Sequence, residues 1–180
     1  MIDFSALEIV IKEQVRNWLE SGEIKYFIGY EKGPNSSIAR PAFIRDPADV
    51  DRLVLGPSCV DNLTRYLVEE MQRKPKRGEE PDLRPVGIVV KPCDSKTLVE
   101  LIKENIVPRE RVKIIAVTNS GTVDPAKLRK VLQQIPQHKR ADSDILQDDH
   151  DLTIKYDGGE RKVNRQELCA GTSTTGVSTK

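Results

Sequence analysis

"VGIVVKPCDSKTLVELIKENIVPRERVKIIAV" (86–117) decides the fold of this chain. It holds two continuous apolar, β-branched runs, at 86–90 and within 111–119, and such runs are typical of strands buried on both faces of a parallel sheet. Between them, residues 94–105 have the spacing of an amphipathic helix. The order strand, helix, strand predicts two parallel strands that are joined by a right-handed crossover.

Further elements are predicted on both sides of this unit. Their spacing and turn residues indicate an amphipathic helix at 3–20, a hairpin of strands at 24–31 and 39–46, helices at 59–74 and 125–135, and a second hairpin at 151–163. The predicted fold class is therefore α/β: a small mixed sheet with a central parallel βαβα unit, flanked by helices and with peripheral hairpins.

Length and composition limit the organisation and the partners. A chain of 180 residues suits one domain, which we expect over 1–168, followed by a disordered tail at 169–180. The net charge of +1 gives no case for a nucleic-acid partner, and no apolar run is long enough to insert in a membrane. Three widely separated cysteines argue against a disulfide framework and for a cytoplasmic setting.

Two loops leave the carboxyl ends of the predicted parallel strands, where ligands of open α/β sheets gather. Their polar residues Lys91, Asp94 and Asn119 are candidate cofactor-binding residues. Cys93 precedes the predicted helix, whose partial positive charge would stabilise a thiolate, and Lys91 would add to this effect. The alternative is that Cys93 is a small residue that fills a tight turn.

The other two cysteines extend this hypothesis. Cys59 also follows a short apolar run and is predicted to open a helix, and Cys169 follows the second hairpin. Three thiols that converge on one edge of the sheet would suit a soft metal ion or an iron–sulfur cluster. The alternative is three unrelated buried thiols.

Three stretches carry a family resemblance: "LGPSCVDNLTRYL" (55–67), "GIVVKPCDSKTLVELIKENIVPRERVKIIAVTNSGTVD" (87–124) and "IKYDGGERKVNRQELCA" (154–170). Together they resemble the front part of iron–sulfur electron-transfer proteins that are related to the beta subunits of coenzyme F420 hydrogenases and dehydrogenases. The resemblance covers roughly residues 50–170 and implies an electron-transfer subunit of a cytoplasmic redox complex. It further implies that other subunits are partners, and that a partner or a segment missing from this chain binds any flavin or deazaflavin.

The resemblance also implies that Cys59, Cys93 and Cys169 are cluster ligands. This chain departs from the family at two of the expected cysteine positions: Thr118 follows the second strand, and Cys169 lacks the partner of a C-x-x-C pair. Three thiolates remain, whereas a cubane cluster normally takes four. The alternative function is therefore a non-catalytic α/β binding or scaffold module with structural cysteines.

Overall fold

The computed structural model describes residues 4–33, 38–73, 78, 80–118, 122–136, 144–147 and 151–169. Within these ranges the elements are, in chain order, α1 (Phe4–Glu20), β1 (Tyr26–Glu31), β2 (Arg40–Ile44), the 3-10 helix η1 (Pro47–Arg52), α2 (Thr64–Gln72), β3 (Val86–Val90), α3 (Pro92–Lys103), the 3-10 helix η2 (Arg109–Arg111), β4 (Val112–Ala116), α4 (Pro125–Gln133), β5 (Asp144–Gln147), β6 (Asp151–Tyr156), β7 (Gly159–Asn164) and α5 (Arg165–Leu168).

The main sheet has four strands in the order β2-β1-β3-β4. β1 and β2 form the predicted antiparallel hairpin. β3 is parallel to both of its neighbours, and its pairing with β4 runs in register from Val86 opposite Val112 to Val90 opposite Ala116. The predicted α/β class and the parallel strand–helix–strand unit are therefore confirmed.

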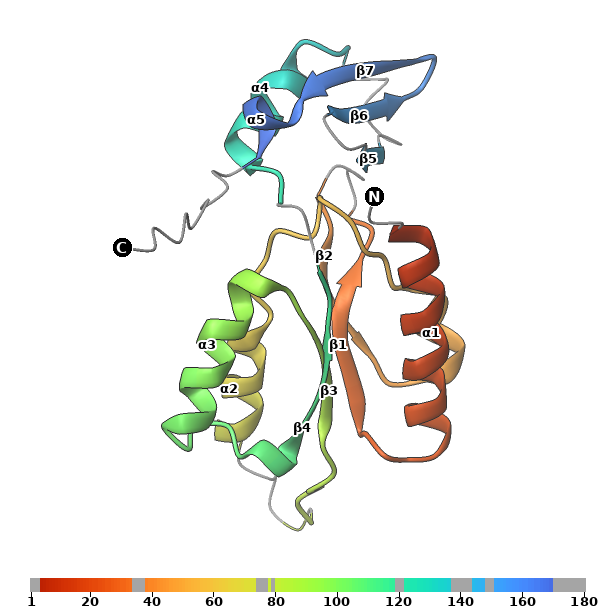
Figure 1. Cartoon of the computed structure of the whole chain (residues 1–180). Coiled ribbons are helices and arrows are strands. Elements are labelled where there is room, and N and C mark those ends of the chain that lie inside the picture. Colours follow the sequence, from red (N-terminus) through yellow and green to blue (C-terminus); the bar gives the residue numbers. More distant parts are fainter. Residues whose placement is uncertain are drawn as a thin grey trace, which may run out of the picture.

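Helices cover both faces of this sheet, with α1 on one face and α2 and α3 on the other (Figure 1). All five residues of β3 are buried, as the apolar run predicted. β4 is only partly buried, so the prediction that it is covered on both faces is wrong. The reason is its position: in the described part of the chain β4 is the last strand of the main sheet and pairs with β3 alone.

Two helices begin at residues other than those predicted. α2 starts at Thr64 rather than at 59, because the Asn62 side chain accepts hydrogen bonds from the backbone N and the hydroxyl of Thr64. α3 starts two residues early, at Pro92, since proline suits the first turn of a helix. Residues 59–63 are consequently an irregular segment that leads into α2.

A second, antiparallel sheet has the order β5-β6-β7 and lies beyond the carboxyl edge of the main sheet, together with α4 and α5 (Figure 1). The predicted β6–β7 hairpin is confirmed, with Gly158 at φ 79° in its turn. β5 lies between the predicted helix at 125–135 and the predicted hairpin at 151–163, where no strand was predicted, and its pairing with β6 makes it a strand. Leu128, Leu152, Ile154 and Leu168 centre a hydrophobic core of their own in this part of the chain.

Among the described residues, no helix combines the length and the apolar character that a bilayer crossing needs. The predicted tail lies outside the described residues except for Cys169, which is buried. The boundary at residue 168 and the disorder beyond it stay predictions.

Candidate functional site

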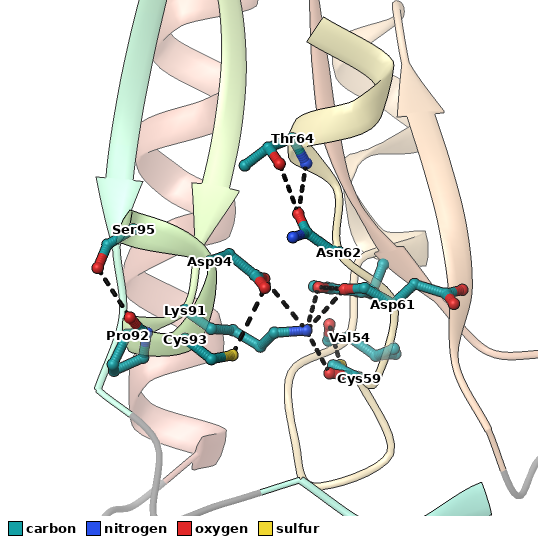
Figure 2. Close-up of polar contacts among 11 residues, drawn as sticks. Val54, Cys59, Asp61, Asn62, Thr64, Lys91, Pro92, Cys93, Asp94 and Ser95 are labelled. Carbon is teal, nitrogen blue, oxygen red and sulfur yellow. Dashed lines mark hydrogen bonds and ion pairs between the residues drawn. The ribbon is translucent and has the colours of Figure 1, made fainter. Parts of the chain in front are cut away.

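The turn from β3 into α3 faces the irregular segment 59–63 at the carboxyl edge of the main sheet (Figure 2). β3 ends at Val90, and the next four residues, Lys91 to Asp94, make the turn and the first helical residues. The structure buries Lys91 and Asp94 and leaves Pro92 and Cys93 exposed. Asn119, the third predicted cofactor-binding residue, lies outside the described residues.

Lys91 reaches back across the edge of the sheet into a shell of oxygen atoms. Its Nζ donates to Tyr30 Oη at 2.6 Å, to the carbonyl oxygen of Cys59 at 2.8 Å and to that of Asp61 at 2.7 Å. Asp94 Oδ2 lies 3.4 Å away, so the two charged side chains, 3% and 8% exposed, form a buried ion pair. We call the four oxygen atoms the Lys91 cage.

Tyr30 contributes to this shell from the middle of the sheet. Its hydroxyl group accepts from Lys91 and donates to the carbonyl oxygen of Asp61 at 2.5 Å. Burial raises the pKa of the Tyr30 phenol far above its ordinary value, and the nearby Asp94 carboxylate adds to the rise. The phenol therefore stays protonated and can serve as donor and acceptor at once.

Cys93 lies in the first turn of α3, and its sulfur donates to Asp94 Oδ1 at 3.5 Å. Partial burial raises the pKa of this thiol, and the Asp94 carboxylate raises it further, against the opposing effect of Lys91. The expectation of a stabilised thiolate at this position is therefore wrong. The helix terminus is outweighed by an adjacent negative charge and by the loss of solvent.

Cys59 lies in the irregular segment, five residues before α2, so the prediction that it opens a helix is wrong. Its side chain is 2% exposed and belongs to the main hydrophobic core. The sulfur donates to the carbonyl oxygen of Val54 at 3.7 Å. Burial raises the pKa of the Cys59 thiol to about 12, so the group is a neutral thiol at physiological pH.

Cys169 lies in a different core. It forms an antiparallel bridge with Val123, and its side chain packs in the hydrophobic core of the second sheet. Val123 in turn donates its N–H to the carbonyl oxygen of Pro57 at 2.9 Å. The segments of Cys59 and Cys169 are thus linked through Val123, while their side chains are buried in separate cores.

In the described residues the three cysteines are not gathered in one place, as the ligands of a cubane iron–sulfur cluster are. The whole chain has three cysteines, and such a cluster normally takes four. Within the described ranges, no three His, Cys, Asp or Glu side chains are grouped so that they could hold a metal ion. All three thiols are free, and two of them are buried. Their role as cluster ligands stays a prediction that comes from the resemblance.

Sequence reasoning found Lys91 and Asp94 but missed Tyr30 and the two backbone carbonyls that complete the shell. Tyr30 lies 61 residues before Lys91 in the chain, and nothing local to its strand distinguishes it from a core aromatic residue. The available signal was indirect. A lysine placed directly after a fully buried strand needs buried oxygen partners, and a nearby tyrosine is one of the few side chains that can supply one.

The sequence and the structure were compared with those of known proteins. No family model matches the chain. The F420-dependent formate dehydrogenase 1 subunit beta of Methanococcus maripaludis is 22% identical in an alignment of 155 residues, which covers 83% of this chain and 37% of that protein.

A structural match shows a similar fold in a solved complex. A chain in a xenon-derivatised structure of the F420-reducing NiFe hydrogenase complex from Methanosarcina barkeri superposes with a TM-score of 0.61 at 15% identity. The match covers 87% of this chain and 53% of that one. This chain thus spans well under two thirds of the length of either relative. The sequence match relates the chain to the beta subunit of an F420-dependent formate dehydrogenase, and the structural match shows that its fold also occurs in an F420-reducing hydrogenase complex.

Proposed function

We propose that the chain is a subunit, or part of a subunit, of a cytoplasmic redox complex of the F420 hydrogenase and dehydrogenase type. The extent of the sequence match carries this proposal, because it covers 83% of the chain. The relatives' names indicate formate or hydrogen as the electron source and F420 as the cofactor. Other subunits of such a complex are the proposed partners.

We propose further that the electron-carrying group, whether cluster, flavin or deazaflavin, is held by a partner and that this chain is an assembly module. Two observations support this division. Cys59 is buried in the main core and its sulfur donates to the carbonyl oxygen of Val54, so ligation would require the side chain to leave this position. Lys91 and Asp94 form a buried ion pair with each other, and the Lys91 ammonium group donates its hydrogen bonds to three further oxygen atoms of the chain. Both charges are therefore already compensated inside the fold and are not offered to a cofactor.

The alternative places electron transfer in the chain itself, with Cys59, Cys93 and Cys169 as ligands and a partner that supplies the fourth. One observation favours it. The segments that carry Cys59 and Cys169 adjoin through the hydrogen bond from Val123 to Pro57. Formation of a cluster would then require both buried thiols to leave their cores.

One purification tests the complex. The tagged full-length chain is expressed in its native cells and isolated without oxygen, and the eluate is assayed for F420 reduction by hydrogen or formate. We expect other subunits and this activity to elute with the chain. A tagged chain that elutes alone and without such activity, while the untagged extract shows it, would contradict the proposal.

A second measurement distinguishes the two locations of the electron carrier. Iron and acid-labile sulfide are determined per chain after anaerobic reconstitution, for the natural chain and for Cys93→Ser. The assembly-module proposal expects neither element in either version. One cluster per chain, lost in Cys93→Ser, would establish the alternative.

A further inference from the structure

The Lys91 cage is built like a binding site for a primary ammonium ion. Three neutral oxygen atoms, from Tyr30, Cys59 and Asp61, accept all three protons of the ammonium group at 2.6–2.8 Å. The group also lies 4.8 Å from the centre of the Tyr30 ring, within the range of a cation–π contact. A buried cation is thereby given back the contacts that it loses when it leaves water.

The oxygen atoms of the cage in turn need the cation, because it is the partner of two of them. Asp94 Oδ2 is buried and accepts no hydrogen bond within the described part of the chain, so its charge is balanced by the Lys91 ammonium group 3.4 Å away. The carbonyl oxygen of Cys59 has Lys91 as its side-chain donor. Removal of the cation would leave a buried carboxylate and at least one carbonyl group uncompensated.

We propose that Lys91 is a positioning residue: its ammonium group acts as an internal cation that holds segment 59–63 against the first turn of α3. The contacts to the carbonyl groups of Cys59 and Asp61 join this segment, which has no regular secondary structure, to the end of β3. The same contacts keep the Cys59 thiol closed inside the main core. This inference does not depend on the proposed role in a redox complex.

The chemistry of the cage explains the choice of lysine. Three acceptors at short distance match the three N–H groups of a compact ammonium ion, whereas a guanidinium group is planar and larger. A primary alkylammonium ion is therefore the ligand class that the cage should accept once Lys91 is removed. Lys91→Ala deletes three carbons and the nitrogen, which n-propylammonium replaces atom for atom.

The test measures the alkylation rate of Cys59 by iodoacetamide in the folded full-length chain, with each cysteine resolved by peptide mass spectrometry. Loss of hydrogen bonds to a charged group should make local opening easier, so Lys91→Ala should label Cys59 about 10- to 100-fold faster. Added n-propylammonium should return the rate toward that of the natural chain. Tetramethylammonium at equal concentration should not, because it has the charge but no N–H donor.

Two controls come from the chain. Lys91→Met fills the space of the lysine stem without a cation, so it should label as fast as Lys91→Ala but should not respond to n-propylammonium. Cys169 lies in the other core and should keep its rate in every variant. Equal acceleration of Cys169 would mean that the whole fold opens, which would overturn a positioning role.

Two further results would overturn the proposal: an unchanged Cys59 rate in Lys91→Ala, or a rate that both cations restore equally. If Lys91→Ala does not fold alone, it is produced with each cation present. Recovery of folded chain with n-propylammonium alone then supports the proposal, and recovery with neither or with both contradicts it. Tyr30→Phe, which removes one cage oxygen and keeps the lysine, should give a smaller acceleration of Cys59, and no acceleration would count against the cage.

Discussion

Two tyrosines on β1 offer a matched test of the energetics of the buried edge. Tyr30→Phe removes the acceptor of the Lys91 ammonium group and the donor to the carbonyl oxygen of Asp61. A hydrogen bond to a charged group contributes about 1.5–3 kcal/mol, so we expect Tyr30→Phe to lower the free energy of unfolding by about that amount. The change deletes one oxygen atom and leaves the ring in place.

Tyr26→Phe is the control, because it makes the same chemical change on the same strand. The Tyr26 hydroxyl donates to Glu70 at 2.8 Å, but Glu70 keeps its ion pair with Lys25 when the hydroxyl is removed. The Tyr26 hydroxyl has this one hydrogen bond, whereas that of Tyr30 has two, and Glu70 is 11% exposed against 3% for Lys91, so the loss should be smaller than for Tyr30→Phe.

Urea denaturation, followed by circular dichroism, gives both values, and thermal melting should show a drop of about 3–12 °C for Tyr30→Phe. If Tyr30→Phe unfolds at the same urea concentration as Tyr26→Phe, the hydroxyl group does not stabilise the buried ammonium group. The ammonium group would then be held by the two carbonyl groups and by Asp94.

Three more predictions concern the sheet and its surroundings. Ile88→Ala in fully buried β3 should lower the free energy of unfolding by about 2–5 kcal/mol in urea, and a loss under about 1 kcal/mol would contradict the two-sided burial of the strand. Gly87→Ala would bring a Cβ within 2.5 Å of the buried Phe27 ring, so we expect a loss of about 1–3 kcal/mol and a lower melting temperature; an unchanged midpoint would refute the close contact. Hydrogen bonds from Arg84 lower the pKa of Asp82 to about 2, so the pair stabilises the fold above pH 3.8 and loses this effect as the pH falls to about 2. Because the pair is exposed, the contribution should be below about 1 kcal/mol, and Asp82→Asn should flatten stability over this pH range, as measured by urea unfolding at each pH.

The main sheet was predictable because its signals are local and agree with one another. Two apolar runs around a helical pattern determine a parallel pair, and the crossover rule leaves one handedness. The predictions failed for strands whose formation or burial depends on the neighbouring strands in the sheet. β5 forms because β6 offers it a pairing edge, and β4 is half exposed because it has one sheet neighbour, and neither fact is encoded in the strand's own residues.

At the candidate site, the positions of the residues could likewise be predicted from the sequence, but their partners could not. That Lys91 and Asp94 lie at the carboxyl edge follows from the predicted topology. That they pair with each other and with the backbone of Cys59 depends on the path of segment 59–63, which was predicted as helix. A helix there would use its carbonyl groups within itself, so the error about the start of α2 concealed the partners of the lysine.

The Lys-Pro-Cys-Asp turn, which carries the most specific part of the family resemblance, divides into two pairs with different physical roles. Lys91 and Asp94 are buried and form an ion pair, and Lys91 also donates a hydrogen bond to the carbonyl oxygen of Cys59 in the facing segment. These contacts give both residues a structural role in this chain. Pro92 and Cys93 are exposed, and proline at the first position of a helix also has a local explanation. Cys93 alone has neither a core position nor a strong partner, because its contact to Asp94 is long and its thiol is neutral. A serine at this position would keep a hydroxyl donor toward Asp94 and should leave stability within about 1 kcal/mol. Any larger effect of that exchange on a purified complex would therefore come from what the thiol contacts in its partners, and not from the fold of this chain.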